Sequence, residues 1–303
     1  MPHTARCSAP AKINLALHVT GQTADGYHAL ESLVAFCKPA DELSLEIEQG
    51  DHAVTLETGG PFGAALGNDA NLVLKAAALL ARRFPDAFGE AGAIRFELEK
   101  NLPVASGIGG GSADAAAALL LLRRVLDLPL NDGALMALGA ELGSDVPMCL
   151  ASSALVARGR GIDIEPVSGF PELFLVLVNP GVSVSTPAVF AALEQKHNPP
   201  LALLPERLAA EALTDWLAGQ RNDLQPPALK LAPAVGEVLS VLEKAGAALS
   251  RMSGSGATCF GLFADLAEAQ EAARSIAASR SGWWVMATQT ADFGMDRACP
   301  DRG

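Results

Sequence analysis

The sequence has few cysteines, and none of them forms a pair that marks a known kind of site. Its five cysteines are scattered along the chain without a Cys-x-x-Cys pair: Cys7, Cys37, Cys149, Cys259 and Cys299. An odd, scattered set argues against a disulfide framework and against a zinc site. We therefore expect a protein of a reducing compartment in which each cysteine is a small buried thiol.

Long apolar runs are also missing, although half of the residues are hydrophobic and the mean hydropathy is +0.26. The longest run beside the glycine-rich region extends from Ala115 to Leu122, and Arg123 ends it. A membrane-spanning helix needs roughly 18 or more apolar residues. Lys12 interrupts the apolar stretch near the N-terminus, so no signal peptide is expected. These observations predict a cytoplasmic protein that does not associate with membranes.

Positive charge is scarce. The 22 lysines and arginines stand against 34 aspartates and glutamates, which gives a formal net charge of −12. Such a chain repels nucleic acid and anionic membranes, and no basic run compensates. We expect neither as a partner, and no obligate protein partner is evident. A phosphate ligand would have to be bound locally, by backbone amides and one or two cations.

Patterned segments predict an α+β fold. Alternating apolar residues predict strands near 11–20, 43–48, 94–99, 173–178, 258–263 and 283–288. Helical spacing predicts helices near 70–83, 114–126, 133–142, 235–245 and 266–278. The order lacks the strict strand–helix repeat of a doubly wound sheet, which favours α+β over α/β.

Three segments lack such patterns. Residues 164–172 are rich in proline, glycine and serine, so they predict a linker between two halves. Residues 194–206 predict a surface loop within the second half, and 294–303 an unpatterned tail.

A glycine-rich stretch, "LPVASGIGGGSADAA" from residue 102, joins a strand to a helix. The strand ends at Leu98 and Glu99, and four glycines between 107 and 111 allow left-handed backbone angles. Ser112 is the expected N-cap of the alanine-rich helix that follows, whose free amides and dipole would form an anion site. The motif is neither a P-loop, since it has no Gly-Lys-Ser/Thr, nor a dinucleotide fingerprint, since Ser112 replaces its last glycine. The glycines alone fit either a phosphate site or a hinge.

Asp114 raises a question within this helix. Its carboxylate suits the helix dipole but would repel a bound phosphate. Either it points away from the ligand or it serves a cation.

Two further segments carry candidate polar residues. In "PAKINLALHV", period-2 alternation places Lys12, Asn14, Ala16 and His18 on one strand face, opposite an apolar core face. These polar residues fit either a solvated face or a site. In "ELGSDVPMCL", Gly143 is expected to close a helix and Pro147 to hold Val146 extended, with Asp145 in a tight corner. An aspartate in such a corner is most often a cap.

Taken in order, six segments resemble the GHMP kinases, which include galactokinase, homoserine kinase, mevalonate kinase and phosphomevalonate kinase. They span Ser8 to Phe263: "SAPAKINLALHVTGQTADGYHALES", "LPVASGIGGGSADAA", "LGSDVP", "NPGVSVSTPAVF", "RNDL" and "MSGSGATCFGLF". The resemblance implies an N-terminal ribosomal-protein-S5-like domain over 1–165 and a C-terminal ferredoxin-like domain over 166–292, with 293–303 as a tail. ATP and substrate would meet in the cleft between the domains.

The combination of "PAKINL" with "DGYH" resembles one branch of the family and implies its reaction. That reaction moves the γ-phosphoryl group of ATP to the 2-hydroxyl of 4-(cytidine 5′-diphospho)-2-C-methyl-D-erythritol, in the non-mevalonate isoprenoid route. ATP and Mg²⁺ would be the cofactors. Asp145 would be the general base, with Lys12 beside it and Asn14 orienting the hydroxyl.

The resemblance also implies the binding residues. The ATP phosphates would be wrapped by Pro103, Val104, Ala105, Ser106, Gly107, Ile108, Gly109, Gly110, Gly111, Ser112 and Ala113. The family's loop often carries a second hydroxyl residue where this chain has Ala113, so no protein ligand for Mg²⁺ is assigned. Cytosine would stack between Tyr27 and Phe190 and bond to His28, and Thr186 would also contact the substrate. Gly254 to Ala257 would contribute further amides, and Asn222-Asp223 of "RNDL" a helix cap without a chemical role.

Two alternatives remain open on the sequence alone. Another kinase of the family, for homoserine or mevalonate, would keep the glycine loop but has no need for "DGYH". A non-catalytic nucleotide-binding protein on the same fold would need neither Lys12 nor Asp145.

Overall fold

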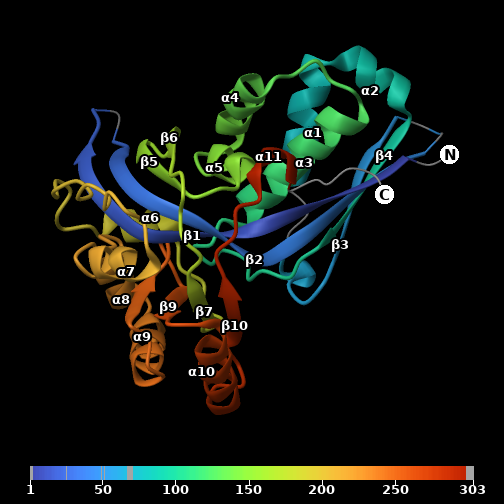
Figure 1. The fold of residues 1–303 in the computed structure, drawn as a ribbon. Coiled ribbons are helices and arrows are strands. Elements are labelled where there is room, and N and C mark those ends of the chain that lie inside the picture. The colour runs from blue at the N-terminus through green and yellow to red at the C-terminus, as the bar shows by residue number, and fades with distance from the viewer. Residues whose placement is uncertain (1–2, 25, 49, 51, 67–70, 298–303) are drawn as a thin grey trace.

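The computed structural model describes residues 3–24, 26–48, 50, 52–66 and 71–297, which form two sheets with associated helices (Figure 1). The first sheet has the strand order β3-β4-β2-β5-β6, and β1 pairs with β2 beside this path. Its strands are β1 (His3–Gln22), β2 (His28–Glu48), β3 (Val54–Gly59), β4 (Ala93–Glu99), β5 (Leu155–Gly159) and β6 (Asp163–Pro166). Among these described strands, only the β3–β4 pair is parallel.

Helices cover one face of this sheet. They are α1 (Leu72–Arg83), α2 (Pro85–Ala91), α3 (Gly110–Val125), α4 (Asp132–Leu142) and α5 (Val146–Ala151). The short helix η1 (Gly63–Ala65) follows β3, and α11 (Gly294–Arg297) packs on α5. The helix α3 is central: Ala115 to Leu122 are all buried, and they pack with Phe36 and Phe96 of the sheet. The longest apolar run near the glycines is therefore a core helix.

The two central strands of the second sheet are buried on both faces. The order of this sheet is β10-β7-β9-β8, all antiparallel: β7 (Phe174–Asn179), β8 (Leu249–Met252), β9 (Cys259–Phe263) and β10 (Trp284–Gln289). Its helices are α6 (Thr186–Ala191), α7 (Ala210–Ala218), α8 (Gln225–Leu231), α9 (Ala234–Lys244) and α10 (Leu266–Ser279). Val176 packs towards α9 and α10, whereas its neighbour Leu175 packs towards β1. This arrangement explains why β7 reads as an unbroken apolar run.

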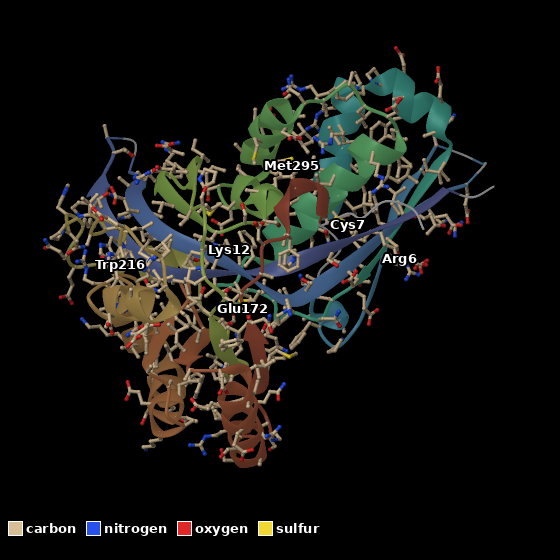
Figure 2. All side chains as sticks on the ribbon, in the orientation of Figure 1. Arg6, Cys7, Lys12, Glu172, Trp216 and Met295 are labelled. Carbon is tan, nitrogen blue, oxygen red and sulfur yellow. The ribbon has the colours of Figure 1, made fainter. Side chains whose placement is uncertain are left out.

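The strand β1 joins the two sheets. Ile13 and Leu15 share one buried cluster with Leu175 and Phe260 of the second sheet. In Figure 1, β1 and β2 are long curved strands that run from the helices of the first sheet to the region of α6 and α7. Lys12 therefore lies at the centre of the molecule, where the two sheets approach each other (Figure 2).

The predicted α+β class is confirmed, as is the existence of every strand and helix predicted from periodicity. Two strands are much longer than predicted: β1 begins at His3 instead of residue 11, and β2 begins at His28 instead of residue 43. Periodicity did not predict η1, β3, β5, β6, β8, α2, α5–α8 or α11, most of which are only three to seven residues long. Short segments hold too few residues for a period to show. Within the described residues, no helix combines the length and apolar character needed to cross a membrane.

Several local predictions are wrong. Residues 164–166 of the expected linker belong to β6, and 294–297 of the expected tail form α11. Residues 298–303, with Cys299, lie outside the described residues. Cys37, Cys149 and Cys259 are free buried thiols as expected, but Cys7 is disulfide-bonded.

The expected geometry beside Asp145 and in the glycine loop also needs correction. Val146 is the first residue of α5 instead of an extended residue, because a proline at the second helical position is tolerated there. Gly109 occupies the N-cap position of α3 and Ser112 lies inside the first turn. The left-handed angles of Gly109 (φ 68°) start the helix without a side-chain cap.

Candidate active site

The structure brings Lys12 and Asp145 together from segments more than 130 residues apart. Lys12 Nζ lies 2.8 Å from Asp145 Oδ2. The lysine comes from the middle of β1 and its side chain is only 4% exposed, whereas the aspartate side chain, just before α5, is 36% exposed. The side chain of Asp145 makes no cap bond to α5. Its carboxylate thus faces the lysine and remains accessible on one side.

Asn14 completes this group. Its Oδ1 accepts a hydrogen bond from Lys12 Nζ (3.0 Å), and its Nδ2 donates to Ser32 Oγ (2.7 Å). Ser32 Oγ in turn donates to the Ala16 carbonyl (2.7 Å), which fixes the direction of the asparagine amide. The shared face predicted for Lys12 and Asn14 does not continue to Ala16, because a register shift between Asn14 and Ala16 places Ala16 in the apolar cluster.

The glycine loop lies directly against this group. Lys12 N–H donates to the Ile108 carbonyl (2.9 Å), and a Cβ on Gly109 would lie 3.0 Å from Lys12 Cε. Gly107 also has a left-handed φ of 76°. The first amides of α3 have no partner within the helix, so they and the ammonium of Lys12 combine into one anion-binding environment.

Asp114 does not face this environment, which answers the question raised by the sequence. It is buried and pairs with Lys100 Nζ (2.6 Å), which also pairs with Asp41. Burial raises the pKa of Asp114 to about 7; the charge of Lys100 opposes the shift and that of Asp41 adds to it. Burial alone would lower the pKa of Lys100, but the two carboxylates outweigh it and the pKa is raised. Asp41 Oδ1 also accepts from the amides of Asn101 and Leu102, so this cluster holds the entry of the glycine loop.

The segment Gly254 to Ala257, which we call the 254–257 motif, packs onto the glycine loop. Thr258 N–H donates to the Ser106 carbonyl (3.0 Å), and Ser253 Oγ donates to the Gly107 carbonyl (2.9 Å). A Cβ on Gly107 would lie 2.8 Å from Gly256 N, so a larger residue would separate the loops. The glycine loop and the 254–257 motif therefore form one continuous surface of backbone.

A second group of predicted residues gathers where β1 turns into β2. His28 stacks on Phe190 of α6, with ring centroids 4.9 Å apart and an interplanar angle of 27°. Tyr27 is 59% exposed, and the Arg160 guanidinium lies 3.9 Å from its ring centroid. Burial, and then the charge of Lys196, lowers the pKa of His28. His28 Nε2 is buried without a hydrogen-bond partner among the described residues.

The two groups are connected in two ways. Thr186 is the first residue of α6, and its hydroxyl lies 2.7 Å from Ser255 Oγ of the 254–257 motif. Both groups also lie on the β1–β2 pair, where Asn14 is opposite Val34 and His28 is six residues before Val34. Six strand residues span at most roughly 20 Å. This spacing suits an extended substrate that is recognised at one end and reacts at the other.

The sequence did not indicate a site role for four residues: Ser32, Lys100, Asp41 and Ser253. Each acts through a partner at least 14 positions away, for example Ser253 through the amide of Asn14 (3.0 Å). No local pattern distinguishes such residues from ordinary polar ones. The position of Lys100 at the end of a strand, just before the glycine loop, was the one available signal.

Comparison with known proteins agrees with this geometry. The family models "GHMP kinases N terminal domain" and "GHMP kinases C terminal" match residues 71–153 and 201–280. A 4-diphosphocytidyl-2-C-methyl-D-erythritol kinase of Chelativorans sp. (strain BNC1) is 49% identical, over 94% of this chain and 95% of its own. The corresponding kinase of Sinorhizobium medicae (strain WSM419) is 51% identical, over 94% of each chain.

Solved structures give the same result. A crystal structure of 4-(cytidine 5′-diphospho)-2C-methyl-D-erythritol kinase is 34% identical with a TM-score of 0.76, covering 94% of this chain and 99% of its own. L. major mevalonate kinase, at 16% identity and a TM-score of 0.71 over 97% and 98% of the two chains, shares the fold. The chain therefore belongs to the GHMP kinases, in the branch that holds the 4-diphosphocytidyl-2-C-methyl-D-erythritol kinases.

Proposed function

We propose that this protein transfers the γ-phosphoryl group of ATP to the 2-hydroxyl of 4-(cytidine 5′-diphospho)-2-C-methyl-D-erythritol, giving the 2-phosphate and ADP. The observation that carries the proposal is the 2.8 Å ion pair between Lys12 and Asp145 beside the glycine loop. The identity of 49–51% to kinases named for this substrate supports the choice of acceptor. The reaction belongs to the non-mevalonate isoprenoid route.

Asp145 is the base of this reaction. Its exposed carboxylate accepts the proton of the 2-hydroxyl as the oxygen attacks the γ-phosphorus, and the bond from that phosphorus to the bridging oxygen of ATP breaks. Lys12 holds the carboxylate in place and is close enough to the loop to stabilise charge on the transferring group. Asn14, oriented by Ser32, is near enough to orient the hydroxyl.

The ATP phosphates bind to the loop from Pro103 to Ala113 and the first turn of α3. The support is the 16-residue helix α3, whose N-cap residue, Gly109, lies against the buried side chain of Lys12. In a chain with a net charge of −12, this is the local arrangement that phosphate binding requires.

Mg²⁺ fits the donors at this site only in part. The hydroxyl of Ser112 in the first turn is an oxygen donor suited to Mg²⁺, whereas Asp114 is occupied by Lys100. We infer that the nucleotide's own phosphate oxygens supply most of the ligands. When bound, Mg²⁺ neutralises negative charge on those phosphates.

The cytosine ring binds at the group formed by Tyr27, His28 and Phe190. An exposed tyrosine offers a flat face for stacking, and Phe190 lies on the ring of His28. The lowered pKa keeps His28 neutral near pH 7, so its unpartnered Nε2 can bond to the edge of a base. Thr186 lies between this group and the glycine motifs, where the diphosphate would pass.

The remaining expectations accompany this proposal. We infer domains over 1–165 and 166–292, a cytoplasmic location, a small-molecule substrate and no obligate protein partner. The first sheet ends with β6 at Pro166 and the second begins with β7 at Phe174, which supports that division.

The test is ADP release by the purified protein with a panel of alcohols. We expect rapid turnover with the cytidyl alcohol, almost none with homoserine or mevalonate, and a product that carries one new phosphate at the 2-position by ³¹P NMR. Turnover with mevalonate or homoserine alone would overturn the choice of substrate. Absence of turnover with every alcohol, alongside tight ATP binding, would support a non-catalytic nucleotide-binding protein.

A further inference from the structure

The segment Arg221–Leu224, "RNDL", has no chemical role in the proposal above, yet it packs against the strand that carries Lys12. It connects α7 to α8 and runs parallel to β1 at Leu17. Leu17 N–H donates to the Arg221 carbonyl (2.8 Å), and Asp223 N–H donates to the Leu17 carbonyl (2.8 Å). The segment is therefore anchored to the strand that carries Lys12 and Asn14.

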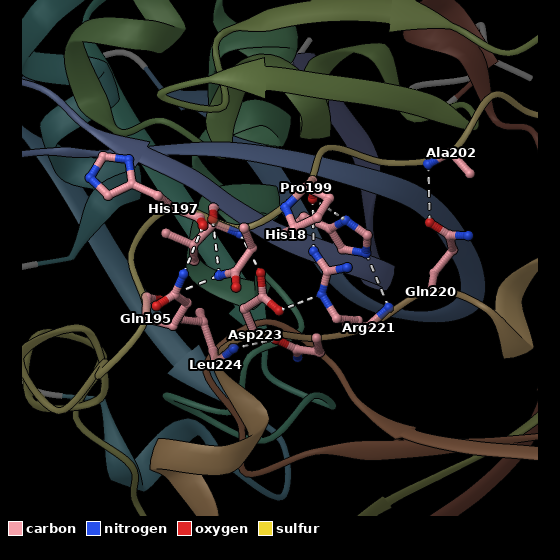
Figure 3. A network of polar contacts seen from close by, with 12 residues as sticks. His18, Gln195, His197, Pro199, Ala202, Gln220, Arg221, Asp223 and Leu224 are labelled. Atoms are coloured by element: carbon pink, nitrogen blue, oxygen red, sulfur yellow. Dashed lines mark hydrogen bonds and ion pairs between the residues drawn. The ribbon is translucent and has the colours of Figure 1, made fainter.

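The side chains on either side of Asn222 hold this segment rigidly (Figure 3). Asp223 Oδ2 accepts from Val19 N–H (2.7 Å), and Asp223 Oδ1 accepts from Arg221 Nε (2.8 Å). Arg221 N–H donates to His18 Nε2 (3.1 Å). The backbone of Asn222 is thus fixed relative to β1 from both sides.

The side chain of Asn222 is buried and fully used. Its Nδ2 donates to two carbonyls, Met252 O (2.7 Å) and Gly254 O (2.8 Å), and its Oδ1 accepts from Leu224 N–H (2.9 Å). The two carbonyls belong to the residues before and after Ser253. One amide group therefore holds both ends of the three-residue segment 252–254.

Ser253 lies between those two carbonyls and contacts both β1 and the glycine loop. Its side chain is fully buried, and Oγ accepts from Asn14 N–H (3.0 Å) and donates to the Gly107 carbonyl (2.9 Å). One hydroxyl thus joins the strand of Lys12 to the glycine loop. Asn222 is therefore linked to β1 and to the glycine loop through the backbone of 252–254 and the hydroxyl of Ser253.

We propose that Asn222 and Ser253 are positioning residues that keep the Lys12–Asn14 strand and the glycine loop in register for phosphoryl transfer. The proposal rests on the function proposed above. Neither side chain reaches the reacting atoms through the contacts described, so their effect is exerted through the backbone. Phosphoryl transfer depends on alignment, and a misplacement of about 1 Å can cost about 100-fold in rate.

The experiment compares Asn222→Asp, Ser253→Ala and the double variant by steady-state kinetics. Asn222→Asp keeps the size and the Oδ1 acceptor but replaces the donor group with an oxygen that faces two carbonyls. Each single variant is expected to lower kcat about 10- to 100-fold, with both KM values within about threefold of wild type. Because Asn222 acts through Ser253, the double variant should be no more than about threefold slower than the slower single variant.

Asn198→Asp is the matched control. Asn198 Nδ2 also donates to two carbonyls, Val19 O (3.1 Å) and Gln195 O (3.3 Å), and neither of them belongs to 252–254. Its kcat is expected to stay within about threefold of wild type. An equal loss in Asn198→Asp, losses that multiply in the double variant, or a loss confined to KM would overturn the proposal. If Asn222→Asp does not fold, a normal kcat in Ser253→Ala overturns it alone.

Amide hydrogen exchange separates this inference from the proposed function. The amides of Lys12 and Thr258 donate to Ile108 O and Ser106 O, so they report on the glycine loop directly. They should exchange faster in Asn222→Asp and Ser253→Ala but not in Asn198→Asp, whichever alcohol the enzyme uses. Unchanged exchange at these amides would contradict the positioning role even if the cytidyl alcohol is the substrate.

Discussion

At the scale of single residues, the site depends on charged side chains that are buried because each has partners. Lys12 and Lys100 are 3% and 1% exposed, and both contact carboxylates. Arg251 is 6% exposed and donates to three backbone carbonyls, those of Leu15, Leu217 and Gln220. A buried charge without such partners would be strongly destabilising. Substitutions here will affect stability as well as activity, so each kinetic test needs a matched measurement of unfolding.

Tyr27→Ala tests recognition of the base. Removing an exposed ring should raise the KM for the cytidyl alcohol about 10-fold or more, because stacking on one aromatic ring contributes about 1–3 kcal/mol. The KM for ATP should change less than about twofold. Steady-state kinetics with each substrate varied in turn gives both values, and an equal rise in both would argue against cytosine stacking.

Asp114→Asn tests the buried cluster through its pH dependence. The pKa of Asp114 is about 7 in the folded protein, against an ordinary value of about 3.9 when unfolded. Between these values the native state binds more protons than the unfolded state, so this group makes the free energy of unfolding fall as pH rises from about 4 to 7. Relative to wild type, Asp114→Asn should therefore become more stable as pH rises through this range. Urea unfolding of both proteins at pH 4.5 and 7.5 measures the difference in their free energies of unfolding. If Asp114→Asn instead became less stable relative to wild type as pH rises from 4.5 to 7.5, the assignment would be refuted.

At the scale of elements, the glycine loop and α3 show how far local sequence reasoning reaches. The run of glycines followed by alanines predicted a sharp turn into a helix, and α3 does begin directly after the glycines. The burial of that helix was not predicted. The cap was assigned to Ser112, because sequence preference cannot show that Gly109 adopts left-handed angles and starts the helix. The partner of Asp114 was not predictable either, since Lys100 and Asp41 meet it only through the fold. Periodicity predicts long elements, whereas ion pairs between distant segments depend on the tertiary arrangement.

Gly107→Ala tests the contact between the two glycine motifs. A methyl group there would meet the backbone at Gly256 N (2.8 Å), and the φ of 76° is unfavourable for alanine. We expect a loss of at least about 2 kcal/mol in the free energy of unfolding. Gly89→Ala, in the exposed part of α2 with open space around it, should instead gain about 0.5–1 kcal/mol. Equal effects of the two substitutions in urea titrations would contradict the close approach.

At the scale of the whole molecule, the two sheets share one buried cluster, to which β1 of the first sheet contributes. Residues of β1, such as Ile13, pack with Leu175 and Phe260 of the second sheet, and Arg251 donates to the Leu15 carbonyl. The family resemblance anticipated two domains, but not that their cores would merge through β1. Lys12 and Asp145 were paired only by that resemblance, because the local pattern around Lys12 fits a solvated face equally well.

A merged core predicts that the two halves unfold together. All three tryptophans, Trp216, Trp283 and Trp284, lie in the second half, so their fluorescence reports on that half alone. Cys149 and Cys259 are free and buried in the first and second halves, and burial raises the pKa of both thiols, so neither should react while folded. Thiol labelling of both cysteines and tryptophan fluorescence should give the same urea midpoint. Two separated midpoints would mean that the sheets unfold independently.

The most direct test of the whole account is ADP formation by Asp145→Asn, measured together with ATP binding. The variant keeps a group that can bond to Lys12 but removes the base, so we expect kcat with the cytidyl alcohol to fall at least about 100-fold. The dissociation constant for ATP should stay within about threefold, because the glycine loop and α3 are unchanged. Turnover at the wild-type rate, or a loss of activity that merely follows a loss of ATP binding, would contradict the role of Asp145 in phosphoryl transfer.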